Sequence, residues 1–316
     1  LRVAVKSRRR TLSLIDVADM TLGANEAVGI VGESGSAKTM LCRSLIGTLA
    51  RHGATVVGGS IRFKEFDLAR ASERTWRRVR GRHIGYIPQS SLAGLNPVLT
   101  IGLQLMEAVR VTGPVGRTEA RRRALELLER VHIPRAAQIF DAHAHELSGG
   151  MRQRVMIAAA IAQKPDVLLA DEPTTALDVT VQREILNLLT DIRKEFGVAL
   201  ILISHDLAVI EAVCDQLVVM YAGATVESGS VATISADSRH PYTRSLMASR
   251  IEDVAPGNDI ATIPGEPVSV GRWPEGCRFH PRCHYAIDAC RAGPQPAMRQ
   301  LEAQRSACIR AEELDA

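Results

Sequence analysis

The segment GESGSAKT, residues 32 to 39, has the residue types of a phosphate-binding loop. Glycines at positions 32 and 35 permit a tight turn whose backbone N–H groups point inward at an anion. In such a loop Lys38 reaches the β- and γ-phosphates of a nucleotide, and the Thr39 hydroxyl binds Mg²⁺. The pattern calls for glycine directly before the lysine, but Ala37 stands there. Taken alone, the segment also fits a surface turn with an incidental lysine.

Two carboxylates, Asp171 and Glu172, end the apolar run VLLADE. At the end of a buried strand, Asp171 can hold the water shell of Mg²⁺. Glu172 beside it can polarise a water molecule for attack on the γ-phosphate. An acidic pair can also simply begin a turn. Its occurrence together with the loop favours a site of nucleotide hydrolysis.

A second candidate anion site is the segment ELSGGMRQR, residues 146 to 154. Ser148 is a suitable N-cap for a helix, and Gly149 and Gly150 leave the first backbone N–H groups of that helix accessible. One nucleotide hardly needs two such helix ends in a single chain.

Alternating apolar runs and helical patterns must position these motifs. Continuous apolar runs of this length fit strands buried on both faces of a parallel sheet, and the alternation with helices predicts an α/β fold. The predicted strands are 27–31, 166–171 and 198–204, and the predicted helices are 38 to about 50, 179–195 and a segment from 207.

Two regions depart from this alternation. Between about Asn96 and Gln163 no strand pattern occurs, and ARRRALELLERV reads as an amphipathic helix. Its predicted apolar face consists of Ala124, Leu127, Leu128 and Val131. After Ser235, proline, glycine and cysteine become frequent, which predicts a separate, loop-rich appendage.

The composition is that of a globular protein. Of 316 residues 46% are hydrophobic and 23% are charged, and the net charge is +4. Aromatic residues make up only 3%, and basic residues cluster only at 6–10 and 121–123, so a solvated surface is favoured over a nucleic-acid patch. The sequence has no secretory signal pattern, and its longest apolar runs fall short of the roughly 20 residues of a membrane span. We therefore expect a soluble or peripheral protein.

The order of these motifs resembles the nucleotide-binding subunit of an ATP-binding cassette (ABC) transporter. Three further segments fit that family: a Q-loop in IGYIPQSS with Gln89, a D-loop in TTALD with Asp178, and a switch histidine in LISHD, His205. The resemblance implies a RecA-like P-loop ATPase core in residues 1–235, an inserted α-helical subdomain at about 91–160, and a small cysteine-containing extension at 236–316.

The resemblance also implies the roles of the site residues. Two subunits would pack head to tail, with ATP between the phosphate loop of one and the LSGG signature of the other. Catalysis would use Glu172, His205 and Gln89, and Mg²⁺ would be held by Thr39, Gln89 and Asp171. ATP would be bound by Gly32, Glu33, Ser34, Gly35, Ser36, Ala37, Lys38, Thr39 and Asp178, and by Ser148, Gly149 and Gly150 of the opposite subunit.

Two departures from the family pattern bear on ATP binding. The Ala37 methyl would crowd a β-phosphate oxygen or penalise a positive φ, at a cost on the order of 1 kcal/mol. The first strands also lack the aromatic residue that the family usually stacks on adenine. Arg8 or Arg9 could place a guanidinium there instead.

Three segments resemble the oligopeptide/dipeptide/nickel branch of the family: QSSLAGLNPVLTIG, HPYTRSLM and IPGEP. This resemblance implies peptide import, with nickel or metal-chelate import and glutathione import as alternatives. The implied partners are a second cassette subunit (identical or homologous), two transmembrane permease subunits and an extracytoplasmic substrate-binding protein, and no nucleic acid. The implied location is the cytoplasmic face of the membrane, as a peripheral subunit.

Cassette ATPases outside transport are the competing class. DNA-repair and chromosome members carry a coiled coil or a zinc insertion, whereas only about 57 residues separate Gln89 from the signature here. Translation-factor members carry two cassettes per chain. A degenerate, mainly regulatory cassette stays open because of Ala37, although Glu172 and His205 are intact.

Four of the six cysteines lie in the last 40 residues: Cys277, Cys283, Cys290 and Cys308. Cys42 and Cys214 fall in predicted core helices and read as small buried residues. A cytoplasmic location disfavours disulfides, and four thiols in a tail with few core residues suggest a metal centre. Zinc sites usually have closer cysteine pairs. The resemblance to some oligopeptide-transporter subunits implies a [4Fe–4S] cluster, with zinc or free thiols as alternatives and His280 or His284 as further ligand candidates.

Overall fold

The structure of the chain is a computed structural model that describes residues 1–6, 11–111, 113–249 and 262–314. The chain forms two compact units, which we call unit 1 and unit 2. Unit 1 combines Leu1–Thr21, Ala27–Ala71 and Ile203–Ala316, and unit 2 combines Leu22–Glu26 and Ser72–Leu202. Unit 1 thus holds the predicted phosphate-binding loop and the cysteine-containing tail, and unit 2 holds the acidic pair and the signature segment.

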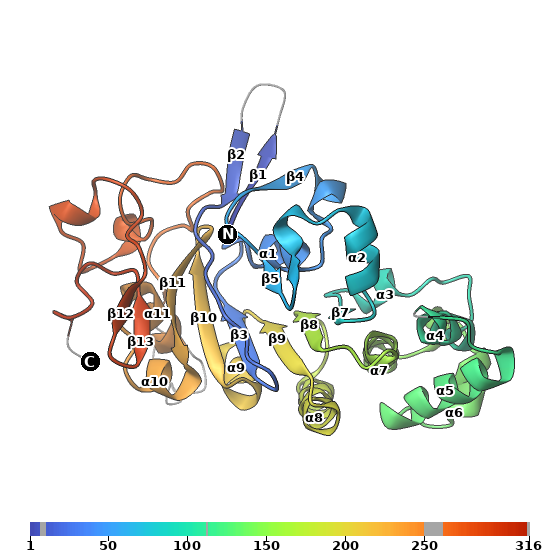
Figure 1. The fold of residues 1–316 in the computed structure, drawn as a ribbon. Coiled ribbons are helices and arrows are strands. Elements are labelled where there is room, and N and C mark those ends of the chain that lie inside the picture. The colour runs from blue at the N-terminus through green and yellow to red at the C-terminus, as the bar shows by residue number, and fades with distance from the viewer. Residues whose placement is uncertain (7–10, 112, 250–261, 315–316) are drawn as a thin grey trace. The chain divides into compact units, whose positions relative to one another are not determined.

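Unit 1 contains most of the strands (Figure 1). The strands are β1 (Arg2–Lys6), β2 (Thr11–Ile15), β3 (Ala27–Val31), β4 (Ala54–Gly58), β5 (Arg62–Phe63), β6 (Phe66–Asp67), β10 (Gln216–Tyr221), β11 (Ala224–Ser230), β12 (Arg299–Leu301) and β13 (Gln304–Ser306). The α-helices are α1 (Lys38–Leu45), α9 (Leu207–Val213), α10 (Val231–Ala236) and α11 (Pro241–Ala248). Short 3₁₀ helices lie at Leu49–His52, Leu68–Arg70, His280–Arg282 and Asp288–Cys290.

The main sheet of unit 1 has the neighbour order β12-β13-β11-β10-β3. Strands β3 and β10 run parallel, and the other neighbouring pairs run antiparallel. Every residue of β3 is buried, as expected of a continuous apolar run inside a sheet. A second, antiparallel sheet has the order β2-β1-β4.

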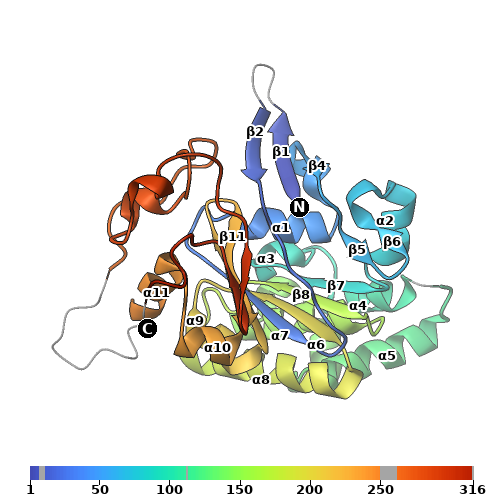
Figure 2. The same ribbon diagram turned by 60° about the vertical axis from the view of Figure 1, so that its left-hand side comes forward.

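The tail of the chain joins this sheet. Strand β13 pairs with β11 (Figure 2). In this ladder Glu227 lies opposite Ser306, and Gly229 lies opposite Gln304. Strand β12 then pairs with β13 at the edge. The tail therefore extends one edge of the sheet that also contains β3, the strand that leads into the phosphate-binding loop.

Unit 2 is mainly helical. Its strands have the order β9-β8-β7 and comprise β7 (Ile84–Ile87), β8 (Val167–Asp171) and all but the last residue of β9 (Ala199–Ile203). Its helices are α2 (Glu73–Val79), α3 (Ser91–Gly94), α4 (Ile101–Arg110), α5 (Arg117–Arg130), α6 (Ala136–Asp141), α7 (Gly149–Ile161), α8 (Val179–Phe196) and a 3₁₀ helix at Ala144–Glu146. Among the described residues no strand lies between β7 and β8, as the sequence predicts.

The structure confirms the predicted α/β alternation and the predicted amphipathic helix, α5. This helix buries Ala120, Ala124 and Leu128, while Leu127 is half-buried. The first predicted helix is shorter than expected. It ends at Leu45 rather than near Ala50, because Gly47 adopts a positive φ of 66° that a continuing helix cannot accommodate.

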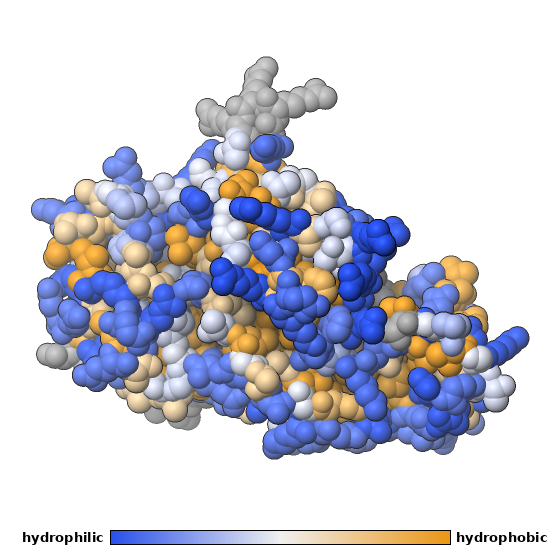
Figure 3. Space-filling view, in the orientation of Figure 1, coloured by the Kyte–Doolittle hydropathy of each residue, from blue (hydrophilic) through white to orange (hydrophobic). Residues whose placement is uncertain are grey.

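In the described part of the chain, no helix combines the length and the hydropathy that a membrane crossing requires. Hydrophilic side chains cover much of the face drawn in Figure 3, and hydrophobic residues occur there in scattered patches.

Candidate nucleotide-binding and hydrolysis site

The phosphate-binding loop follows β3 directly in unit 1. Gly32 has φ 153°, and a Cβ atom there would lie 2.1 Å from the carbonyl oxygen of Met220, so only glycine fits. Gly35 has φ 82° with open space around it. Helix α1 begins at Lys38, so its N-terminal N–H groups face the loop. The loop thus has the compact turn and helix start that bind phosphate.

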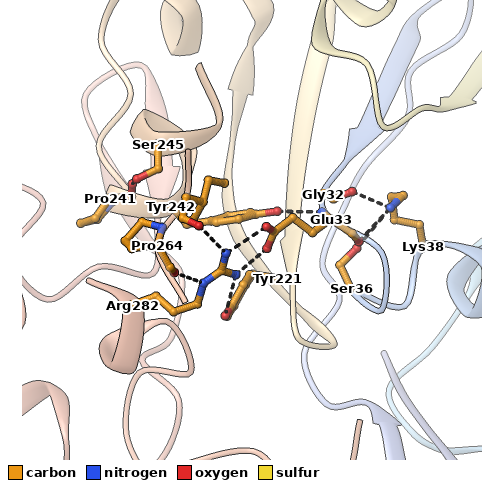
Figure 4. Close-up of polar contacts among 11 residues, drawn as sticks. Gly32, Glu33, Ser36, Lys38, Tyr221, Pro241, Tyr242, Ser245, Pro264 and Arg282 are labelled. Atoms are coloured by element: carbon orange, nitrogen blue, oxygen red, sulfur yellow. Dashed lines mark hydrogen bonds and ion pairs between the residues drawn. The ribbon is translucent and has the colours of Figure 1, made fainter. Parts of the chain in front are cut away.

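Lys38 is held by oxygens of its own loop. Its Nζ donates to the carbonyl oxygens of Gly32 (2.6 Å) and Glu33 (3.1 Å) and lies 3.4 Å from Ser36 Oγ (Figure 4). The side chains of Lys38 and Ser36 are buried, whereas Ser34 and Gly35 are exposed and Thr39 is half-buried. The ammonium group therefore lies within the loop, and it can exchange loop oxygens for phosphate oxygens.

Ala37 adopts a left-handed conformation, with φ 77° and ψ 19°. The sequence analysis expects either crowding of a β-phosphate oxygen or a positive φ at this residue, and the structure shows the positive φ. A non-glycine residue in this region costs on the order of 1 kcal/mol. The loop therefore keeps the turn that glycine would favour, with strain at the residue directly before Lys38.

Unit 2 brings Gln89 and Glu172 together. Gln89 Nε2 donates to Glu172 Oε2 (3.0 Å), and Thr175 Oγ1 donates to the same oxygen (2.9 Å). Asp171, the last residue of β8, is 3% exposed, and Glu172 follows with a positive φ of 47°. The carboxylate of Glu172 is thus oriented by two donors. The sequence alone does not indicate this role of Thr175, although the segment TTALD contains it three residues before the D-loop aspartate.

The signature segment starts helix α7. Ser148 is its N-cap and accepts from the Met151 N–H (3.3 Å), and Gly149 and Gly150 are its first two residues. A Cβ atom on Gly150 would lie 2.7 Å from Val181 Cγ1. Asp178 caps the neighbouring helix α8 by accepting from the Val181 N–H (2.9 Å). The signature therefore packs against the start of α8, next to the D-loop.

His205 follows β9 and belongs to unit 1. Its side chain is exposed. The residues on either side fix the turn: Ser204 donates its N–H to the Ile30 carbonyl (3.1 Å), and Asp206 caps α9 by accepting from the Ala208 N–H (2.9 Å). The bond to Ile30 ties this turn to β3, the strand that leads into the loop. Arg8 and Arg9, the candidates for adenine stacking, lie outside the described residues.

The four tail cysteines line one cavity in unit 1. Its other lining residues are His240, Pro241, Phe279, His280, Tyr285, Ala286, Ile309 and Arg310. All four thiols are free, and burial raises the pKa of Cys277 and of Cys308 to about 11. In the part of the chain that is described, no three His, Cys, Asp or Glu side chains converge to hold a single metal ion.

His240 adds an unusual group to this cavity. It is 1% exposed, and burial lowers its pKa to about 3, so the ring is neutral. Its Nδ1 accepts from the Tyr242 N–H (3.1 Å), so the ring proton resides on Nε2. Nε2 is buried without a hydrogen-bond partner. His280 is engaged locally, with its Nδ1 2.9 Å from the Cys277 carbonyl oxygen.

Two protein families match this chain. Residues 15–175 match the family described as ABC transporter, and residues 226–290 match the family described as oligopeptide/dipeptide transporter, C-terminal region. A relative in Brucella abortus (strain 2308) is named "Putative peptide import ATP-binding protein"; it is 45% identical over 298 residues, 94% of this chain and 89% of the relative. A second relative with that name in the same strain is 41% identical over 327 residues, 100% of this chain and 97% of the relative.

Solved structures match the fold. A dimeric ATP-binding cassette in a post-hydrolysis state, bound to ADP and phosphate, is 24% identical with a TM-score of 0.65, covering 73% of this chain and 96% of that one. CbiO1 from Clostridium perfringens, described as part of the ABC transporter complex cbiONQ, is 26% identical with a TM-score of 0.63, covering 74% and 90%. The fold is the RecA-like P-loop ATPase fold of these cassettes, as the sequence predicts.

Proposed function

This chain belongs to the ABC transporter family of ATPases, and on that basis we propose that its ATP hydrolysis powers the import of dipeptides and oligopeptides through a membrane permease. One observation carries the proposal. The cassette and the C-terminal region described for oligopeptide/dipeptide transporters occur in one chain, and relatives that match over almost its whole length are named for peptide import.

In the proposed mechanism, the loop of one subunit binds ATP through Lys38 and the N–H groups at the start of α1. Bound Mg²⁺ supplies charge neutralisation at the β- and γ-phosphates. Thr39, Gln89 and Asp171 fit this ion because they offer hydroxyl, amide and carboxylate oxygens, the donors that Mg²⁺ prefers. The subunit's own Asp178 and the partner's LSGG segment complete the nucleotide site.

Glu172 is the general base in this proposal. Its carboxylate accepts the proton of the attacking water, and the donors Gln89 and Thr175 hold one carboxylate oxygen in place. His205 would contact the γ-phosphate side of the site. Since Gln89 also begins the segment that leads into the helical part of unit 2, its bond to Glu172 links hydrolysis to the region proposed to dock on the permease.

The proposed assembly contains a second cassette subunit, two transmembrane permease subunits and an extracytoplasmic substrate-binding protein, with this chain at the cytoplasmic face. The domain boundaries in this proposal are 1–235 for the ATPase, including a helical subdomain at about 91–160, and 236–316 for the extension. Nickel-chelate or glutathione import by the same branch is the alternative cargo.

We also propose that Cys277, Cys283, Cys290 and Cys308 hold one metal centre, with a [4Fe–4S] cluster preferred over zinc. Among the described side chains, no three His, Cys, Asp or Glu residues are arranged to hold a single metal ion. Support comes from the cavity itself: all four thiols line it, and the buried Nε2–H of His240, which lies on its wall, has no partner. A cluster needs four thiolates that surround a larger object, and an N–H donor stabilises its sulfur atoms.

A transport measurement tests the import proposal. The chain is co-purified with its permease subunits, reconstituted in vesicles, and assayed for ATP hydrolysis with and without the binding protein loaded with di- or oligopeptides. Stimulation by peptides supports the proposal. Stimulation only by a nickel chelate or by glutathione would replace peptides as cargo. ATP binding without hydrolysis under any of these conditions would favour the regulatory cassette, for which the strained Ala37 is the supporting observation.

A further inference from the structure

The phosphate-binding loop and the cysteine tail are joined by an ion pair. Arg282 Nη1 donates to Glu33 Oε2 (2.6 Å) and Nη2 donates to Glu33 Oε1 (3.0 Å), a bidentate pair across 249 positions of sequence (Figure 4). The side chain of Arg282 is 3% exposed and that of Glu33 is 23% exposed. Bidentate pairs of this kind are strong and fix the relative orientation of both groups.

The direction of Arg282 is fixed by further contacts with the tail and with β10. Its Nε donates to the Pro264 carbonyl oxygen (2.7 Å), and Nη1 also lies 3.4 Å from the Tyr221 hydroxyl. The guanidinium lies 5.9 Å from the ring centres of Tyr221 and of Phe279. These contacts hold Arg282 in one position beside the loop.

Glu33 is held at three of its groups. Its side chain binds Arg282, and its N–H donates to the Tyr242 hydroxyl (2.7 Å). Its carbonyl oxygen accepts from Lys38 Nζ (3.1 Å) and from the Ser36 N–H (3.1 Å). Tyr242 is fully buried and lies in α11 of the tail region. Two side chains of the tail, Arg282 and Tyr242, thus hold Glu33, whose carbonyl oxygen contacts Lys38.

The ion pair with Arg282 also neutralises the charge of Glu33. Glu33 is an anionic side chain inside a loop that must receive an anionic triphosphate. With Arg282 in place, the pair has no net charge. Without it, the partly buried carboxylate would repel the phosphates, since like charges repel each other strongly at short range.

We propose that Arg282 is a positioning residue for ATP binding: through Glu33 it holds the phosphate-binding loop in its receptive form and removes a competing negative charge. The proposal rests on ATP binding by this loop, which follows from the family, and not on the cargo. Cys283, which lines the cysteine cavity, follows Arg282 directly in the chain.

Arg278 provides a matched control for a merely structural role. It is also buried, at 4% exposure, and it also anchors the tail within unit 1. Its guanidinium donates to the Ala222 carbonyl oxygen (2.7 Å) and to the Asp16 carboxylate, and it lies 3.6 Å from the ring centre of Trp273. These partners lie outside residues 32–39. Loss of either arginine should loosen the tail, but only Arg282 contacts a loop side chain directly. Arg278 reaches the loop only indirectly, because Gly223, next to its partner Ala222, donates its N–H to the Ser36 carbonyl oxygen (3.2 Å).

The test is ATP titration of the full-length chain, purified anaerobically, with a fluorescent ATP analogue and Mg²⁺, together with thermal unfolding without nucleotide. We expect Arg282→Met to weaken ATP binding about tenfold, because a bidentate charged pair to the loop is lost. Arg278→Met should lower the unfolding temperature similarly but leave ATP affinity within about twofold. Arg282→Lys should recover part of the affinity, since it restores charge without bidentate geometry.

A double-mutant cycle keeps the test valid if Arg282→Met is poorly folded. The change is repeated in a Glu33→Gln background, where no carboxylate remains uncompensated. If Arg282 acts through Glu33, its removal there should alter ATP affinity by no more than about twofold. An equal loss of affinity in both backgrounds, or an equal loss with Arg278→Met, would overturn the proposal. The measured ATP affinity does not depend on transport. The proposal on Arg282 is therefore tested independently of the proposal on the cargo.

Discussion

Gln89 donates a hydrogen bond to Glu172, with 3.0 Å between Nε2 and Oε2. The two residues are 83 positions apart and come from the ends of neighbouring parallel strands, β7 and β8. Thr175 donates to the same carboxylate oxygen. The residue proposed as the base is therefore oriented before ATP arrives, by a side chain that leads into the helical part of unit 2.

This arrangement predicts the effect of Glu172→Gln. The amide oxygen of the new glutamine can still accept a hydrogen bond from Gln89. The turn after β8 and the affinity for ATP should therefore change little. The amide cannot take a proton from water, so turnover should fall by about 10²- to 10⁴-fold. Glu184→Gln is the control, because Glu184 is an exposed acid of unit 2 that pairs with Arg154. ATPase assays of both variants in the purified transporter decide the matter, and an unchanged rate for Glu172→Gln would exclude it as the base.

A second prediction concerns Ala37→Gly. Glycine relieves the left-handed strain at φ 77°, so ATP binding should tighten by a few-fold, consistent with a penalty on the order of 1 kcal/mol. His132→Gly is a matched control, since His132 also has a positive φ (57°) but lies in the helical part of unit 2. It should relieve comparable strain without changing ATP affinity. Weaker binding by Ala37→Gly would mean that the loop has adapted around the methyl group.

The predictable part of the site is the part encoded locally. The glycines at positions 32 and 35 indicate a tight turn, and Ser148 indicates the start of a helix. Buried strands such as β3 read directly as apolar runs. These features depend on a few consecutive residues, and the structure places them as expected.

Other parts depend on contacts between distant segments. The sequence places Glu33 among the ATP-binding loop residues, but nothing near it indicates its partner Arg282, 249 positions later. The pairing of β13 with β11 was equally hidden, since each partner contributes only three residues to the ladder. Short strands and buried ion pairs have no periodicity that a sequence could display. The unpartnered Nε2 of His240 likewise emerges only when α11 is placed beside the cysteine cavity.

A third prediction concerns Glu227, a fully buried residue of β11. It accepts from the backbone N–H groups of Arg239 and His240, but burial raises its pKa to about 7. In the unfolded chain a glutamate has a pKa of about 4.3. The folded state therefore binds this proton more tightly, and the stabilisation that it brings is present below the unfolded pKa and is lost as pH rises through about 7.

The measurement is the free energy of unfolding at pH 5 and at pH 8. In the wild type, the free energy of unfolding should fall by about 3 kcal/mol from pH 5 to pH 8 because of Glu227. In Glu227→Gln this fall should be absent, whatever the absolute stability of the variant. Glu302→Gln, on the exposed turn between β12 and β13, should retain the wild-type slope. A Glu227→Gln protein with the full wild-type slope would show that another group causes the pH dependence.

The last prediction concerns the tail cysteines. Anaerobically purified protein should be brown and contain about four irons per chain with little zinc, because four thiolates around one cavity match the ligand set of a [4Fe–4S] cluster. Serine at Cys277, Cys283, Cys290 and Cys308 should abolish the colour and lower the unfolding temperature, since the tail has few apolar residues of its own. Serine at Cys42 and Cys214 is the control, because these buried thiols lie outside the cavity and should leave the iron content unchanged. One zinc per chain without iron would contradict the cluster but keep a metal centre. No bound metal, with four titratable tail thiols and unchanged stability after their replacement, would contradict both.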